Sequence, residues 1–311
     1  MKRREFVASG AAAALLSALR AKAADVKRFK LGVITDEVTQ DFEQALVWIK
    51  GFRLEWAELR FLWNKYVMDL TPDDVKRAQD LLAKHDIKIS VIDSPYFKTL
   101  LPGTESKFAE GKPDPLQSDF SQQNAILERA IARAKDFGTD KVRIFGFLRV
   151  ADPKIVFDRV ARELDRSASI AKKENIRLVL ENESSCNVAT GVESGAMLRA
   201  VKSPSLGANW DPGNAYDAGE NPFPGGYDAL DKKRMWHMHL KDAATNVSGG
   251  GTHWMPIGSG KIDFVGQFRA LIKDGYEGTM SLETHYLNAA KNKEESSRKS
   301  MNGLLKVIQE A

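Results

Sequence analysis

The sequence predicts an α/β protein with a closed parallel (β/α)8 barrel, the TIM-barrel architecture. Eight short runs rich in β-branched and apolar residues alternate with longer amphipathic segments, the pattern of parallel strands joined by helices. An open doubly wound sheet usually has a glycine-rich phosphate loop after its first strand. Here the first strand leads into residues 35–38, Thr-Asp-Glu-Val, without a glycine. The pattern therefore favours closure of the sheet.

The predicted elements follow one another along the chain in this alternating order. The predicted strands are residues 29–34, 56–61, 87–92, 141–145, 176–180, 206–210, 235–240 and 278–282. The predicted helices are residues 41–50, 72–84, 121–136, 153–173, 192–201, 264–274 and 294–310. Thr71, with Asp74 three residues later, forms a capping-box pattern that predicts the start of the second helix.

Three long connections follow predicted strands, at residues 93–119, 211–232 and 241–263. Long loops at the carboxyl ends of barrel strands are where such a barrel builds its active site. Residues 211–232 are rich in glycine and proline and are expected to form a loop with a turn of helix.

The first 23 residues have the layout of a secretory signal. Lys2, Arg3 and Arg4 precede an apolar run of about twelve residues, and an A-x-A-type site follows at residues 21–23. The paired arginines predict the twin-arginine route and an exported, periplasmic protein. The run is shorter than the roughly 20 residues of a membrane span, so no stable membrane anchor is expected. Residues 24–311 are then predicted to form a single barrel domain; the alternative is an uncleaved cytoplasmic N-terminus.

The net charge disfavours a nucleic-acid partner. The whole chain is formally +4, and residues 1–23 carry five positive side chains against one negative one, which leaves the remainder near zero. A protein that binds nucleic acid normally has a basic patch or stripe, and no global excess of positive charge is present. Cys186 is the only cysteine, so no intramolecular disulfide can form.

Four consecutive predicted strands deliver potential metal ligands to the same rim. Glu181, Asp211 and Glu283 directly follow the fifth, sixth and eighth strands, and His239 lies near the end of the seventh. Three carboxylates that converge without a cation repel one another and raise one another's pKa. A divalent cation removes this conflict, and oxygen-rich ligation with one imidazole favours Mn²⁺ or Mg²⁺, with Co²⁺ or Zn²⁺ also possible. The alternative is a structural ion-pair network.

Such a network would use Lys241 and Arg143 as its cations. Six side chains near the rim are also candidates for substrate contact: Glu58, Arg60, Asn214, His237, Lys241 and Trp254. Alternation along a strand places His237, His239 and Lys241 on one face, although His237 equally suits a packed core position. Glu58 and Arg60 alternate on the second strand and reach either a substrate or each other. Trp254 is a platform for a sugar ring or a side chain packed against the barrel.

The ordered segments LxLEN, NWDPGN, HMHLKD, PIGSGKIDF and SLE resemble the xylose-isomerase-like TIM-barrel superfamily. That group includes ketose 3-epimerases, hydroxypyruvate isomerase, inosose dehydratase and endonuclease IV, and the resemblance covers essentially all of residues 24–311. It implies metal ligation by Glu181, Asp211, His239 and Glu283, with the two glutamates also acting as the acid/base pair. It further implies that Asp242 is a carboxylate that orients the imidazole of His239; the alternative is an exposed acidic residue of the loop.

The resemblance implies a metal-dependent isomerase or epimerase that removes a proton next to the carbonyl of a small keto or aldo sugar. Asn214 departs from the pattern, because the epimerases usually have a substrate-contacting histidine there and an amide cannot shuttle a proton. The alternative is a lyase or dehydratase that eliminates a β-substituent from an oxidised (3-keto) glycoside or an inosose-like substrate. Relatives are often dimers or tetramers, so a homo-oligomer is possible.

Two other classes fit the residues less well. A DNA-repair endonuclease of the endonuclease IV type needs three zinc ions and many histidines, whereas this chain has five. A sugar-binding barrel without catalysis has no need of three acids around one histidine.

Overall fold

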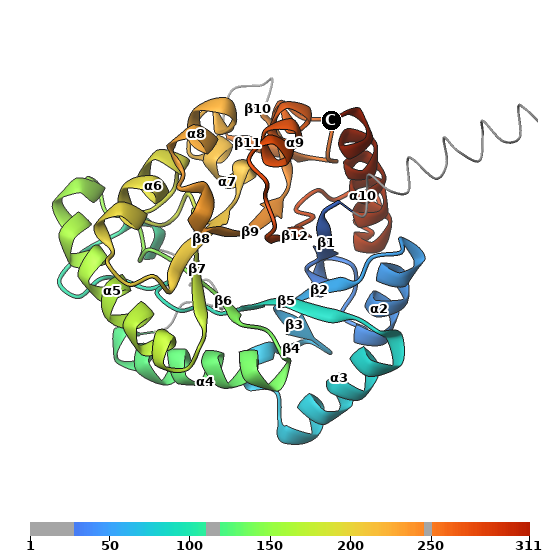
Figure 1. The fold of residues 1–311 in the computed structure, drawn as a ribbon, viewed down its shortest axis with the longest axis horizontal. Coiled ribbons are helices and arrows are strands. Elements are labelled where there is room, and N and C mark those ends of the chain that lie inside the picture. Colours follow the sequence, from blue (N-terminus) through green and yellow to red (C-terminus); the bar gives the residue numbers. More distant parts are fainter. Residues whose placement is uncertain (1–27, 110–118, 246–250) are drawn as a thin grey trace, which may run out of the picture.

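Eight parallel strands surround the axis of the molecule and form a nearly closed barrel (Figure 1). The computed structural model describes residues 28–109, 119–245 and 251–311, so the predicted signal at residues 1–23 lies outside the described residues. The strands are β1 (Lys30–Val33), β2 (Trp56–Leu59), β5 (Lys88–Asp93), β6 (Lys141–Ile144), β7 (Arg177–Glu181), β8 (Leu206–Trp210), β9 (Met235–Leu240) and β12 (Thr279–Leu282). The predicted fold class and all eight predicted strands are confirmed.

The barrel closes between its first two strands. The order of hydrogen-bonded strands is β1-β12-β9-β8-β7-β6-β5-β2, and a parallel bridge between Ile34 and Glu58 joins the two ends of this order. A side chain on Gly32 would place its Cβ 2.6 Å from the carbonyl oxygen of Trp56. Because no side chain fits in that space, glycine at position 32 allows β1 and β2 to approach closely.

Helices surround the strands in chain order around the outside of the barrel (Figure 1). They are α2 (Phe42–Gly51), α3 (Pro72–His85), α4 (Gln123–Asp136), α5 (Phe157–Lys173), α6 (Gly191–Ala200), α9 (Phe264–Lys273) and α10 (Lys293–Glu310). The short helices α7 (Pro212–Asp217) and α8 (Tyr227–Ala229) lie between β8 and β9, as expected for a loop with a turn of helix. Within the described ranges, no helix has the length and apolar character needed to cross a membrane.

Local sequence signals explain where these helices begin. The predicted capping box is confirmed at α3, where Thr71 Oγ1 accepts a hydrogen bond from the Asp74 N–H at 3.2 Å. In return, Asp74 Oδ2 accepts the Thr71 N–H at 3.0 Å. The cap satisfies backbone donors that have no partner inside the helix, and such caps typically contribute ~1 kcal/mol each.

Two short hairpins extend from the strand ends. β3 (Phe61–Leu62) pairs with β4 (Lys65–Tyr66) after β2, and β10 (Asp242–Thr245) pairs with β11 (Thr252–Met255) after β9. The second hairpin lies within the long connection predicted at residues 241–263.

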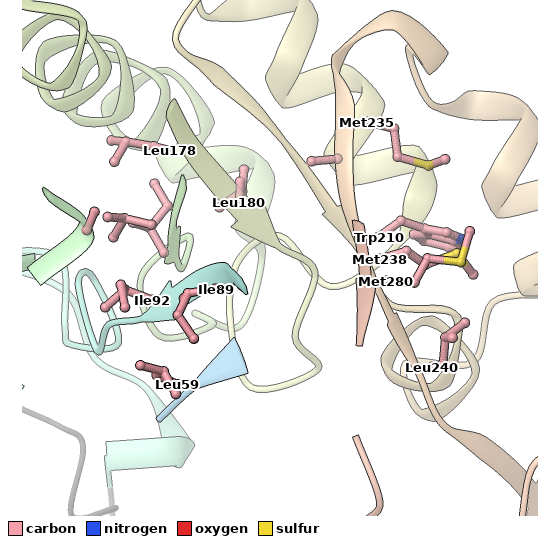
Figure 2. Close-up of a cluster of buried hydrophobic side chains, with 14 of the residues drawn as sticks. Leu59, Ile89, Ile92, Leu178, Leu180, Trp210, Met235, Met238, Leu240 and Met280 are labelled. Carbon is pink, nitrogen blue, oxygen red and sulfur yellow. The ribbon is translucent and has the colours of Figure 1, made fainter. Parts of the chain in front are cut away.

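The hydrophobic core lies between the strands and the helices. Leu178 and Leu180 of β7 belong to this layer, as do Trp210, Met238 and Met280, which are register neighbours on β8, β9 and β12 (Figure 2). Each fully buried side chain of this size contributes about 1.5–3 kcal/mol relative to an exposed one. The outer layer therefore accounts for most of the hydrophobic stabilisation.

The inner wall of the barrel is polar instead. Successive side chains of a strand point to opposite faces, so residues that alternate with the apolar ones line the interior. The inner residues make polar contacts with one another across the barrel, and they include Glu58, Arg143, Glu181, Asn209, His237 and His239, all buried. Barrel interiors are usually filled with Val, Ile and Leu. This polar interior leads directly to the rim where the candidate site lies.

Candidate metal centre

The four predicted metal ligands converge at the carboxyl end of the barrel. Glu181 is the last residue of β7, Asp211 and Glu283 directly follow β8 and β12, and His239 is the fifth residue of β9. His239 Nδ1 lies 3.2 Å from Glu181 Oε1, 3.3 Å from Glu283 Oε2 and 3.8 Å from Asp211 Oδ2. One ligand atom from each residue lies within 4.8 Å of the other three. All four residues are at most 4% exposed.

This donor set fits a divalent cation. Three carboxylate oxygens surround one ring nitrogen in a buried space. Asp211 Oδ2 forms an ion pair with Lys241 Nζ at 2.9 Å without a hydrogen bond, and buried carboxylates that converge are costly unless positive charge offsets them. Oxygen ligands with one imidazole are the ligation that Mn²⁺ and Mg²⁺ accept, and Zn²⁺ or Co²⁺ accept it too.

The structural ion-pair network, which the sequence predicted as the alternative to a metal site, is also represented by ion pairs here. Lys241 Nζ lies 2.6 Å from Glu283 Oε2 and 2.9 Å from Asp211 Oδ2. Arg143 donates to Glu181 Oε2 at 2.9 Å. Lys241 and Arg143 are at most 4% exposed, so both cations belong to the interior. The site thus combines a metal-ligand geometry with fixed cations around it.

These cations do not balance the negative charge of the site. Among the described residues, the ion pairs that connect to the four ligands contain seven carboxylates and three arginine or lysine side chains, and a protonated His239 adds a fourth positive charge. The carboxylates are Asp36, Glu37, Glu58, Asp93, Glu181, Asp211 and Glu283, and the cations are Arg60, Arg143 and Lys241. A divalent cation would reduce the excess, which an ion-pair network alone leaves in place.

The two glutamates predicted to transfer protons are held in their charged form. Burial raises the pKa of Glu181, but His239 and Arg143 outweigh this effect and lower that pKa to about 2. Burial also raises the pKa of Glu283, and Lys241 together with His285 and His239 brings it well below its ordinary value. Both carboxylates are therefore ionised at neutral pH, as metal ligation and proton acceptance require.

The imidazole of His239 is protonated when no cation is bound. Burial lowers its pKa, but the charges of Glu58, Glu181 and Glu283 outweigh burial and raise that pKa well above its ordinary value. A cation at Nδ1 must displace this proton, because a histidine binds a metal through an unprotonated nitrogen.

We expect Mn²⁺ binding at pH 7 to release about one proton, because His239 carries one in the metal-free protein. Below the raised pKa, the apparent affinity should fall about tenfold for each pH unit that the solution is acidified, since proton and cation compete for Nδ1. Titration calorimetry in two buffers with different ionisation enthalpies measures the number of protons released. A binding enthalpy that does not depend on the buffer would contradict this expectation.

Trp254 and His285 lie beside the ligands. Lys241 Nζ is 5.3 Å from the ring centre of Trp254, whose ring meets the imidazole of His285 edge-on at 5.2 Å. His285 Nε2 lies 3.3 Å from Glu283 Oε1, and 35% of the His285 side chain is exposed. Both side chains thus contact partners of the site, and the sugar-platform role of Trp254 stays a prediction.

The other predicted substrate contacts lie at different depths. Glu58 and Arg60 do not pair with each other: Arg60 donates to Asp36, Glu37 and Glu283 near the rim, and its side chain is 15% exposed. Glu58 and His237 are fully buried below His239, and their side chains bond to each other at 2.8 Å. A substrate contact for Arg60 fits this position, whereas Glu58 and His237 lie in the interior.

Asn214 supports a ligand in this structure. Its Nδ2 donates to Glu181 Oε1 at 3.0 Å and to the Asn182 carbonyl at 2.9 Å. Since both hydrogens of this amide are used, Asn214 fixes the orientation of Glu181, and its predicted substrate contact would involve only its amide oxygen.

The role implied for Asp242 is wrong. Its carboxylate accepts backbone N–H groups of Ala243, Gly258 and Gly260, at 2.8, 2.9 and 2.9 Å, and none of its hydrogen bonds goes to His239. Asp242 is three residues from His239, and alternation therefore turns the two side chains to opposite faces. Asp242 instead holds the glycine-containing loop that follows β11.

Sequence reasoning missed two features of the site. Asp93 holds Arg143 at 3.0 Å while Arg143 donates to Glu181, and the pair Asp36 and Glu37 lies in the connection after β1. Asp93 is the last residue of β5, and this position at the end of a barrel strand carries a signal for it. For Asp36 and Glu37 the signal is their position at the end of a barrel strand.

Comparisons with known proteins agree with this fold. A family model described as xylose isomerase-like TIM barrel matches residues 49–307. No curated protein matches the chain significantly. Among solved structures, the IolI protein with a bound zinc atom superposes with a TM-score of 0.70 at 16% identity, covering 90% of this chain and 98% of that one.

Two further solved structures are similar over most of their length. A probable 3-DHS dehydratase, AsbF, involved in petrobactin synthesis in Bacillus anthracis, has a TM-score of 0.66 at 16% identity and covers 87% of this chain and 98% of that one. An L-ribulose 3-epimerase has a TM-score of 0.63 at 16% identity and covers 90% of this chain and 95% of that one. Identities this low show a shared fold.

Proposed function

Because the chain belongs to the xylose isomerase-like TIM barrel family, we propose that it is a divalent-metal-dependent enzyme acting on a small carbohydrate. In this proposal the enzyme removes a proton from the carbon next to a carbonyl group and acts as an isomerase or epimerase. The observation that carries the proposal is the convergence of Glu181, Asp211, His239 and Glu283, with one ligand atom of each within 4.8 Å of the others.

A cation held by these four residues would polarise the substrate carbonyl and so acidify the adjacent C–H bond. Glu181 and Glu283 lie on different strands, and their oxygens approach His239 Nδ1 at 3.2 and 3.3 Å. One ionised carboxylate accepts the proton from the carbon and, now a neutral acid, returns it to the neighbouring carbon; protonation of the other face of the same carbon requires that the second carboxylate first takes a proton from solvent. Arg143 fixes Glu181 and Lys241 fixes Glu283, which keeps both carboxylates in place.

Manganese or magnesium suits the three carboxylates best, with cobalt or zinc as further options. The similar IolI structure contains zinc, which supports a divalent cation without selecting among these metals. Export by the twin-arginine route remains part of the proposal, and it is tested by detecting the cleaved protein in a periplasmic fraction.

A second candidate reaction is an elimination. The position at which epimerases usually carry a substrate-contacting histidine holds Asn214, whose Nδ2 is committed to Glu181 and to the Asn182 carbonyl. Without a proton donor there, a carbanion formed next to the carbonyl could expel a β-hydroxyl or β-glycosyl group instead of being reprotonated. The similar structure described as a probable 3-DHS dehydratase supports keeping this lyase reading, with a 3-keto-glycoside or an inosose-like compound as substrate.

Solvent-deuterium exchange tests the proposal for both reactions. The purified protein is first analysed for its metal content, then loaded with Mn²⁺ and incubated in ²H₂O with keto sugars and 3-keto-glycosides. We expect deuterium at the carbon next to the carbonyl of one compound. A rearranged or epimerised sugar then identifies an isomerase, whereas a released aglycone or an unsaturated product identifies a lyase. Absence of both bound metal and exchange would overturn the proposal.

A further inference from the structure

A column of buried polar side chains lies directly below the metal ligands. Glu58 of β2 contacts two histidines of β9 across the barrel: its Oε1 is 3.0 Å from His239 Nε2 and its Oε2 is 2.8 Å from His237 Nε2. His237 Nδ1 in turn lies 2.7 Å from Thr279 Oγ1 on β12. Glu58 and both histidines are fully buried, and Thr279 is 3% exposed. Three strands thus contribute to one chain of contacts that ends at a metal ligand.

The contacts of Glu58 determine how His239 presents its ring. A fully buried carboxylate needs hydrogen-bond donors, and the ring N–H groups of His239 and His237 lie within hydrogen-bond distance of its two oxygens. When Nε2 of His239 carries the hydrogen that Glu58 accepts, Nδ1 is left with the lone pair that a cation needs. Nδ1 is the atom that faces the oxygens of Glu181, Asp211 and Glu283.

The rest of the column fits the same arrangement. A neutral imidazole donates through one nitrogen only, and His237 Nε2 faces Glu58 Oε2 at 2.8 Å. Donation from Nε2 to Glu58 leaves Nδ1 as an acceptor, and the hydroxyl of Thr279 is the donor at 2.7 Å. Asn209 lies 3.1 Å from His239 Nε2, and its Oδ1 has no other hydrogen-bond partner. A 180° rotation of the Asn209 amide exchanges its oxygen and nitrogen, and Oδ1 then accepts the hydrogen on His239 Nε2.

Glu58, His237 and His239 also satisfy the spacing of a metal site of their own. Two cations would then share His239, one at each ring nitrogen, which requires an imidazole that has lost both of its protons. The upper group offers three carboxylates to a single cation, whereas the lower group offers one carboxylate between two imidazoles. The contacts of Glu58 with His237 and His239, at 2.8 and 3.0 Å, have the lengths of ordinary hydrogen bonds.

We propose that Glu58 is the positioning residue of the metal centre: it accepts the Nε2 hydrogen of His239 and thereby aims Nδ1 at the cation, while His237 and Thr279 hold Glu58 in place. This role replaces the one implied for Asp242, and it rests on the proposed function. A carboxylate that accepts the second ring N–H of a metal-bound histidine fixes the tautomer and the ring orientation of that ligand. Loss of such a partner typically lowers metal affinity about 10–100-fold.

The test compares Glu58→Gln with Asp242→Asn in the full chain. Both substitutions remove one buried carboxylate charge, but only the first removes a partner of His239. Titration calorimetry with Mn²⁺ should show an affinity about 10–100-fold lower for Glu58→Gln. Asp242→Asn should stay within about twofold of the wild type even where its melting temperature falls, because its contacts stabilise a loop away from His239.

A second readout distinguishes positioning from a general loss of stability. Nitrogen-15 NMR of the Zn²⁺-loaded wild type should show His239 with a hydrogen on Nε2 and the metal on Nδ1. Thr279→Val removes only the hydroxyl that contacts His237, and it should weaken Mn²⁺ binding several-fold with the barrel intact, so it serves where Glu58→Gln does not fold.

Three outcomes would overturn the proposal. Equal Mn²⁺ affinity in the wild type and in Glu58→Gln would remove the role of Glu58 alone and leave the metal centre standing. Metal on Nε2 in the wild type would do the same. A wild type that binds no divalent cation would overturn the proposed function and this role together.

Discussion

Replacing Glu283 by glutamine is expected to abolish solvent-deuterium exchange and turnover, with a loss of about 10³-fold or more. A glutamine amide cannot accept a proton at neutral pH, and general acid–base catalysis typically contributes about 10²–10⁴-fold. Glu283 is 4% exposed and contacts His239 and Lys241, so the amide also removes the negative partner of Lys241. Exchange into the active sugar is measured by NMR at saturating Mn²⁺, with metal content determined on the same samples.

Glu277→Gln is the matched control for this variant. Glu277 is exposed and lies just before β12, at the opposite end of the strand from Glu283. Glu277→Gln makes the same chemical change as Glu283→Gln. The rate of deuterium exchange of this control variant should stay within about twofold of the wild type. Exchange that persists in fully metal-loaded Glu283→Gln would place the base on another residue, and Glu181 would then be the next to test.

Exhaustive chelation is expected to abolish turnover and to lower the melting temperature by about 5–10 °C. A ligand present at about 100 times its Kd stabilises the folded state by about 2.7 kcal/mol, and each kcal/mol shifts the melting temperature of a chain of this size by about 2–4 °C. The ligands come from β7, β8, β9 and β12, so the cation ties four strands of the barrel together. Calorimetry with and without chelator, followed by addition of Mn²⁺, measures the loss and its recovery.

Asp211→Asn provides the control for chelation. It removes the charge of one ligand, so the variant should bind the cation weakly and its melting temperature should not respond to the chelator. Full turnover of the wild type with no detectable metal would contradict the metal-dependent mechanism.

The fold was predictable because its signals are local. Short runs of β-branched and apolar residues separated by amphipathic segments located all eight strands, and Thr71 with Asp74 located the start of α3. The four ligands were predictable for the same reason, since each lies at or near the end of a strand and parallel strands end at one rim. These inferences need only the position of a residue within its own element.

Partners across the barrel were not predictable in this way. Glu58 and His239 are 181 positions apart in the sequence, and β2 meets β9 only through the interior of the closed sheet. Asp242 lies close to His239 in the sequence but points to the opposite face, and for this reason the implied contact was wrong. The family resemblance favoured Asp242, whereas closure of the barrel places Glu58 at the imidazole.

The polar inner wall has a consequence for how such a protein changes over generations. Its apolar layer lies outside the strands, against the helices, and its charged residues lie inside. Folding and reactivity therefore depend on opposite faces of the same eight strands. Substitutions on the polar inner face can alter the reaction without destabilising the packing of the apolar outer face. Descendants of a single ancestor can therefore acquire different chemistry while they keep the same fold.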